Sequence, residues 1–170
     1  CGDEKLIAFS CKRRGFCPSC GGRRMAETAA FLTDEILPKV SIRQWVLSFP
    51  FPLRYLMAAN PKVQSAILAI TMRAITGFIR KQLKRKTKAP VETGAVTLIQ
   101  RFGGSVNLNV HFHMLVLEGG YESHAGQTRW REVPPPSDEN VATILKTLSR
   151  RILKYLIRHG YFTHADEPAA

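Results

Sequence analysis

Two histidines in a short alternating stretch are the residues of this sequence best placed to do chemistry. From Ser105 to Met114, polar and apolar residues alternate, and His111 and His113 fall on the polar positions. A period of two predicts a half-buried strand whose polar face carries both imidazoles. Histidines two positions apart project the same way, close enough to hold one metal ion or one phosphate oxygen. The alternative is a pair of solvated histidines on an exposed sheet face.

The four cysteines form a second candidate site, because all of them lie at the start of the chain, at Cys1, Cys11, Cys17 and Cys20. The segment CPSCGG, residues 17–22, is typical of a zinc knuckle: two thiolates leave a tight turn, and glycines let backbone amides approach the sulfurs. Disulfides are uncommon in a basic chain without a secretory signal, and a redox C-x-x-C pair needs a preceding strand that is absent here. We therefore expect a structural zinc ion bound by these four cysteines.

The start of the chain affects which thiols bind this zinc. The sequence begins at Cys1 and not at Met, which indicates a trimmed chain. In that case Cys1 could be the second half of a C-x-x-C pair, and Cys11 a fifth, optional thiol.

The charge of the chain indicates a polyanionic partner. The 170 residues carry a formal net charge of +12, with a pI near 10.0, and nucleic acid is the expected partner of such an excess. Six of the cations lie between residues 80 and 88, around the end of one predicted helix. Complementing the helix dipole does not need six charges, so phosphate contact explains this cluster better. No run of about 18 apolar residues occurs, so we expect no membrane span. The candidate DNA contacts are Lys12, Arg13, Arg14, Arg23, Arg24, Arg80, Lys81, Lys84, Arg85, Lys86 and Lys88.

The elements that must position these residues predict an α+β fold. Apolar stripes and capping residues predict helices over 23–37, 60–86 and 137–160. Alternation predicts strands over 41–49, over 95–102 and through the histidines, with a loop after Leu117. We expect an antiparallel sheet that carries the histidines, helices packed on it, and a zinc knuckle in front. The expected domains are 1–37, a zinc-binding module, and 38–170.

The turn between the last two strands sets which residues face each other. Gly103-Gly104 predicts a two-residue hairpin turn. That turn would place Gln100 opposite Asn107, with Asn109 and His111 on the same face. A three-residue turn would change this register.

Three segments, in order, resemble bacterial rolling-circle insertion-sequence transposases. FSCKRRGFCPSC, residues 9–20, resembles their zinc-binding amino-terminal domain. IQRFGG, residues 99–104, followed by NLNVHFH, residues 107–113, resembles their catalytic domain, a histidine–hydrophobic–histidine endonuclease fold. RQWVLSFP, residues 43–50, matches between them. The resemblance extends over nearly all of the chain.

This resemblance implies a transposase that nicks single-stranded DNA at transposon ends. His111 and His113 would hold a divalent ion, Mg or Mn, while a tyrosine attacks the scissile phosphate and forms a phosphotyrosine. The zinc module and the basic helix would grip DNA next to the cut. The resemblance also implies a bacterial, cytoplasmic protein associated with the nucleoid, with no membrane partner.

The sequence departs from the family at the nucleophile. The tyrosines that follow the histidine strand are Tyr155 and Tyr161, six residues apart and separated by Gly160, so they fall on different helix faces. We expect both to be packing residues, with the nucleophile and the third metal ligand beyond Ala170. This chain would then bind DNA and metal without cleaving.

Two other functions are compatible with parts of the sequence. One is a zinc-dependent DNA-binding module whose histidines are inert. The other is a cupin-like metal site, since His111, His113 and Glu118 have the ligand spacing of that fold's first motif. The second cupin motif is missing, and long apolar helices disagree with an all-β barrel.

Overall fold

A computed structural model describes residues 18–84, 90–103, 107–124 and 126–163 of the chain. Its contacts divide the chain into two compact units, Cys1–Lys39 and Val40–Ala170. Each unit is described by itself below.

The described part of the first unit is helical. Helix α1 spans Pro18–Phe31 and continues as the π-helical turn η1, Leu32–Ile36, which ends before Pro38. The helix begins five residues earlier than the predicted start at residue 23, because a proline suits the first helical turn, where its missing N–H would have no partner. The backbone of residues 18–22 is therefore helical, and the zinc knuckle expected over residues 17–22 stays a prediction, because Cys17 lies outside the described residues.

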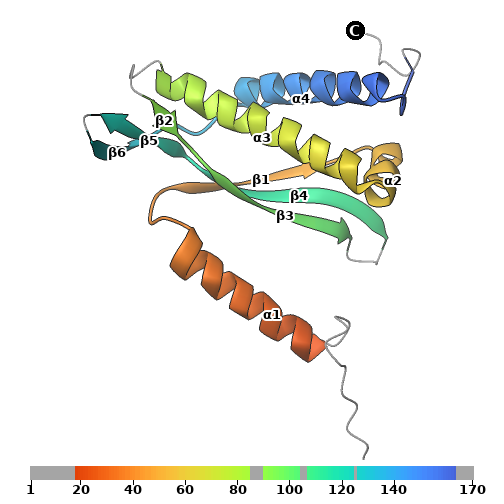
Figure 1. Cartoon of the computed structure of the whole chain (residues 1–170), viewed down its shortest axis with the longest axis horizontal. Coiled ribbons are helices and arrows are strands. Elements are labelled where there is room, and N and C mark those ends of the chain that lie inside the picture. The colour runs from red at the N-terminus through yellow and green to blue at the C-terminus, as the bar shows by residue number, and fades with distance from the viewer. Residues whose placement is uncertain (1–17, 85–89, 104–106, 125, 164–170) are drawn as a thin grey trace, which may run out of the picture. The chain divides into compact units, whose positions relative to one another are not determined.

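The second unit contains the strand of the two histidines at the centre of a sheet. This antiparallel sheet consists of β1 (Ile42–Ser48), β3 (Ala95–Phe102) and β4 (Leu108–Leu117), in the order β1-β4-β3 (Figure 1). Along β4, Val110, Phe112, Met114 and Val116 are buried in the core. The histidines occupy the alternate positions and lie on the other face. The three predicted strands and their alternation are confirmed.

The hairpin between β3 and β4 differs from the prediction. Gln100 pairs with His111 and not with Asn107, and a bulge lies between Gln100 and Phe102. The Gly103 N–H donates to the Asn107 carbonyl at 2.9 Å, so the two-residue turn is wrong. From Ala95 to Gln100 the register has moved by four residues, and an even shift keeps these side chains on their predicted face, whereas beyond the bulge Phe102 pairs with Leu108, a shift of three. Gln100 therefore still shares a face with His111.

A second sheet replaces the loop expected after Leu117. It consists of β2 (Val91–Glu92), β5 (Gly119–His124) and β6 (Gln127–Glu132), in the order β2-β5-β6. Two glycines at the start of β5, Gly119 and Gly120, allow close backbone approach to neighbouring strands. A Cβ atom on Gly119 would lie 2.2 Å from the Arg131 carbonyl, and one on Gly120 would lie 2.7 Å from the Glu92 carbonyl. Only glycine fits at such positions in a sheet.

Helix α2, Phe51–Ala59, was not predicted from the sequence. Pro50 and Pro52 indicated the end of the preceding strand, which is correct, but they also begin this helix. The Pro50 carbonyl accepts from the Leu53 and Arg54 amides at 3.0 and 3.1 Å. Proline at a helix start loses no hydrogen bond, so the same residues that end a strand can open a helix.

Two long helices, α3 (Pro61–Lys84) and α4 (Asp138–Arg158), pack against each other on one side of the histidine-bearing sheet (Figure 1). Both predicted caps are confirmed. The Asn60 side-chain oxygen accepts from the Lys62 and Val63 amides, and Ser137 Oγ accepts from the Asn140 amide. Helix α4 ends just before Gly160, whose φ is +73°. By length and composition α3 could span a membrane, contrary to our expectation. It packs into the core of this unit, however, and 39% of its most apolar 18-residue stretch is buried.

Candidate metal and nucleic-acid site

His111 and His113 lie near the middle of the open sheet face, which we define as the face of β1, β3 and β4 that points away from α3 and α4. Their strand is central, so each histidine has one neighbour on either side. Ser48 and Gln100 flank His111, while Val46 and Leu98 flank His113. Val46 is 56% exposed and Leu98 is 48% exposed, so His113 sits between two accessible apolar side chains.

The backbone fixes the tautomer of His111. Its Nδ1 lies 2.6 Å from the carbonyl oxygen of Asn109. A carbonyl can only accept, so Nδ1 carries the proton and donates it. The remaining nitrogen, Nε2, then has a free lone pair, which is the form in which histidine binds a metal ion. His111 is only 9% exposed, so its orientation is held by packing as well.

A carboxamide holds the second histidine. The Gln44 Nε2 atom lies 3.0 Å from Nδ1 of His113. In this arrangement the amide donates to Nδ1, and Nε2 of the neutral ring carries the proton. A half-turn of the carboxamide would let its oxygen accept from Nδ1–H and would free Nε2 for a metal ion. The two imidazole rings are 4.8 Å apart between centroids, close enough to share one ion.

The donor atoms on this face fit a divalent cation. Asn109, two positions before His111, has a buried Oδ1 atom with no hydrogen-bond partner in the described ranges, and a buried polar atom without a partner calls for a ligand or an ion that would satisfy it. Two imidazoles with an amide oxygen suit manganese better than magnesium, which prefers oxygen ligands throughout. The described residues contain no group of three His, Cys, Asp or Glu side chains that could hold a metal. A third protein ligand from these residues would therefore be a neutral oxygen, such as the Asn109 amide oxygen.

Comparison with protein families identifies both ends of the chain. A family model described as a transposase zinc-binding domain, of the IS91 type, matches residues 1–49. A transposase model of the Y2 type matches residues 94–166, which include both histidines. The chain belongs to the insertion-sequence transposases. Neither the curated proteins nor the solved structures contained a significant match.

The first of these matches indicates that the transposase binds zinc. Cys1, Cys11 and Cys17 lie outside the described residues, so the ligand set predicted from the sequence stays a prediction. A cupin-like role for Glu118 is not supported, because this carboxylate pairs with Arg43. The strands also form two open sheets of three strands.

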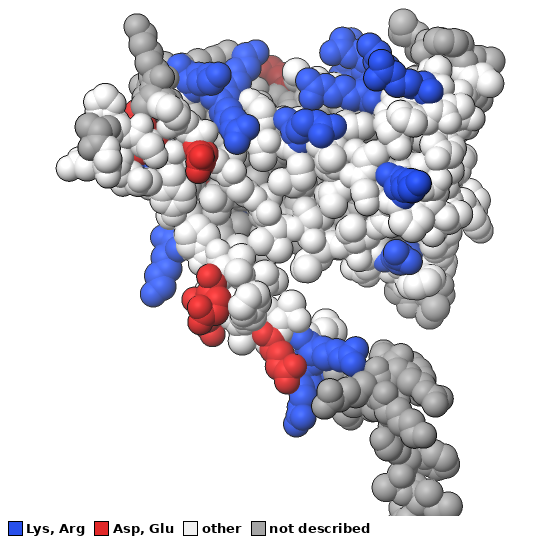
Figure 2. Space-filling view, in the orientation of Figure 1, with Lys and Arg blue, Asp and Glu red and all other residues white. Residues whose placement is uncertain are grey.

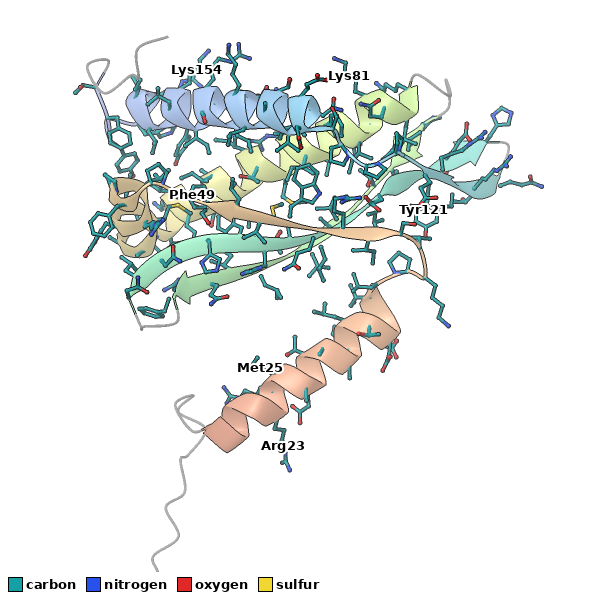
Figure 3. The ribbon with its side chains drawn as sticks, turned by 180° about the vertical axis from the view of Figure 1, so that it is seen from behind. Arg23, Met25, Phe49, Lys81, Tyr121 and Lys154 are labelled. Carbon is teal, nitrogen blue, oxygen red and sulfur yellow. The ribbon has the colours of Figure 1, made fainter. Side chains whose placement is uncertain are left out.

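The predicted DNA contacts of the transposase fall in different places. Arg23 and Arg24 are exposed on α1 of the first unit. Arg80, Lys81 and Lys84 are exposed at the end of α3, which lies on the side of the sheet opposite the histidines, as the labelled Lys81 shows in Figure 3. We expect from the sequence that the basic helix grips DNA next to the histidines. In the structure, this part of the helix does not flank them. Lys12, Arg13, Arg14, Arg85, Lys86 and Lys88 lie outside the described residues.

Neither candidate tyrosine of the transposase lies on the histidine face. Tyr155 packs against the core and stacks on His159, with ring centroids 4.3 Å apart. The Tyr161 hydroxyl accepts from the Asn60 side chain at 2.8 Å, next to the start of α3. Both contacts belong to the helical side of the second unit, since Tyr155 is part of α4 and Asn60 precedes α3.

Proposed function

We propose that this transposase binds single-stranded DNA and a divalent cation, Mg or Mn, on the open sheet face. The observation that carries the proposal is the pair of imidazoles 4.8 Å apart on the central strand, with Nδ1 of His111 donating to a backbone carbonyl. Within its family role in DNA transposition, the full-length protein would nick and join strands at transposon ends. It would act in the bacterial cytoplasm, near the nucleoid.

Each residue of this face has a distinct task in the proposal. His111 and His113 would hold the cation, and Asn109 Oδ1 would add an oxygen ligand. A cation bound there supplies positive charge next to the scissile phosphate. Val46 and Leu98 flank His113 and leave exposed apolar surface beside the proposed cation. The structural zinc would be held by the cysteines of the first unit.

The nucleophile is proposed to lie outside these 170 residues. In the full-length protein a tyrosine oxygen would attack the phosphorus, forming a phosphotyrosine and releasing the 3′-hydroxyl, so the bond energy is kept for rejoining. Tyr155 and Tyr161 are engaged on the helical side, so this chain would bind without cleaving. A covalent DNA adduct on either tyrosine in a single-turnover assay would contradict this.

A second candidate function is a zinc-dependent DNA-binding module whose histidines bind no metal. The placement of Tyr155 and Tyr161 on the helical side, and not on the histidine face, favours this module. The two functions differ in metal content. The catalytic assignment requires a second ion at the histidines, whereas the binding module requires zinc alone.

Metal titration separates these functions. We would measure zinc content and manganese binding for the wild type and for a His111→Ala/His113→Ala double variant. His124→Ala/His159→Ala, which removes two exposed histidines elsewhere, is the matched control. We expect about one zinc per chain in all three proteins and a manganese site lost only from the first variant. Equal manganese binding in all three would exclude the histidine site.

A further inference from the structure

A row of cations runs along the outer side of α4. Lys146, Arg150, Lys154 and Arg158 are spaced four residues apart and are all exposed. The buried residues of this helix, Ile144, Leu148, Ile152 and Leu156, each precede one of them by two positions. Two positions correspond to about 200° of rotation around a helix. The cations therefore point away from the core, as Lys154 does in Figure 3.

Helix α3 adds a second row beside the first. Arg73, Arg80 and Lys84 follow each other at intervals of seven and four residues, which keeps them on one helix face, with Lys81 next to them. All four are exposed, and Figure 2 shows Lys and Arg side chains over both helices. We call the combined surface the α3–α4 basic face. It consists of Arg73, Arg80, Lys81, Lys84, Lys146, Arg150, Lys154 and Arg158.

Acidic residues are nearly absent from these two helices. Helix α3 has none, and α4 has only Asp138 and Glu139, in its first turn. Among the described residues, ion pairs join Arg43 to Glu118 and Arg131 to Glu122, and neither pair involves α3 or α4. Like charges four residues apart destabilise a helix, and an ordinary solvated face mixes both signs. A surface of one sign indicates a polyanionic ligand.

The side chains on this face favour duplex DNA over a single strand. Proteins that hold single strands combine cations with exposed aromatic side chains on which bases stack. The aromatic residues of α3 and α4 are Phe78 and Tyr155, and both are partly buried against the core. Contacts limited to cations read the phosphate backbone and not the bases. The row on α4 is about 18 Å long, roughly half a turn of a duplex.

We propose that the α3–α4 basic face binds duplex DNA through its phosphates, on the side of the sheet opposite His111 and His113. The transposase would then hold two forms of its substrate at once, a duplex on the helices and a single strand on the open sheet face. The identification of the polyanion as DNA rests on the proposed function. The location of the surface rests on the geometry of α3 and α4.

The test compares two double variants of the full chain that remove the same charge. Arg150→Gln/Lys154→Gln removes two cations from the middle of the α4 row. Lys39→Gln/Arg129→Gln removes one lysine and one arginine that are exposed elsewhere. Binding to a duplex and to a single strand of the same length is measured over a series of salt concentrations. Thermal melting of each protein shows that it is folded.

We expect the first variant to bind the duplex about tenfold more weakly and to reduce the slope of log affinity against log salt by about two, one for each lost phosphate contact. Single-strand binding should match that of the control variant. Because the substitution removes repulsion, the variant should melt no lower than wild type. Equal duplex affinity and salt slope in the two variants would overturn the proposal, as would an equal loss for duplex and single strand. Manganese binding tests the histidine site separately.

Discussion

At the scale of single residues, the two histidines differ in what holds their Nδ1 atoms. A backbone carbonyl fixes His111, whereas the carboxamide of Gln44 contacts His113. A carbonyl can only accept, but a carboxamide can present either its nitrogen or its oxygen. The tautomer of His113 therefore depends on one side chain, which the backbone geometry does not impose.

Substitution of Gln44 should change manganese affinity through His113. We expect Gln44→Ala to weaken manganese binding by about tenfold or more, as is usual for groups that orient a histidine ligand. Gln44→Glu should bind at least as tightly as wild type, because a carboxylate can only accept and keeps the proton on Nδ1. Isothermal titration measures both affinities. Gln100→Ala is the control, since Gln100 lies opposite His111 but donates to the Phe102 carbonyl. Equal affinity in the two Gln44 variants would show that Gln44 does not orient His113.

At the scale of elements, two helical-region glycines have opposite roles. Gly77 lies inside α3 and is exposed, and a Cβ atom added to it would have no neighbour within 4 Å among the described residues. Gly160 follows α4 at a φ of +73°, a conformation that residues with a Cβ atom rarely adopt. Gly77 therefore weakens α3 although no close contact requires a glycine there, whereas Gly160 terminates α4.

Alanine at these two positions should shift stability in opposite directions. Gly77→Ala should raise the free energy of unfolding by about 1 kcal/mol, the difference in helix propensity. Gly160→Ala should lower it by about 1 kcal/mol, because the left-handed conformation becomes strained. Urea unfolding followed by tryptophan fluorescence reports the second unit alone, since Trp45 and Trp130 both lie in it. A loss of stability on Gly77→Ala would indicate a contact of this position that the structure does not contain.

At the scale of the whole molecule, the chain forms two units with separate sets of contacts. The core of the second unit includes Phe112, which is fully buried and packs edge-on against Phe49 with ring centroids 5.1 Å apart. The first unit is matched by a zinc-binding family. Small zinc modules derive their folding energy from the metal, whereas a unit of about 130 residues has a sufficient apolar core.

Removing zinc and removing core volume should therefore affect different units. A strong chelator should abolish zinc binding and leave the tryptophan-monitored transition of the second unit unchanged. Phe112→Ala should lower the stability of the second unit by about 3–5 kcal/mol, as is typical for truncating a buried phenylalanine, with zinc content unchanged. Metal analysis and urea unfolding on the same samples measure both effects. If the chelator also lowered the stability of the second unit, or if Phe112→Ala also lowered the zinc content, the two units would unfold together.

The sequence by itself determined the local features of this protein. Alternation identified β1, β3 and β4, and it placed the histidines on one face even though the predicted hairpin register was wrong by four residues. Asn60 and Ser137 correctly marked the starts of α3 and α4. These features depend on periods of two or 3.6 residues and on capping hydrogen bonds within one turn, so they can be read from neighbouring residues.

Only the tertiary structure decided which elements lie together. It showed that Gly119 and Gly120 belong to a strand, that two prolines open α2, and that Gln44 reaches His113. It also placed the basic end of α3 on the side of the sheet opposite the histidines. These outcomes depend on backbone approach and packing between segments distant in the chain, which no local pattern encodes.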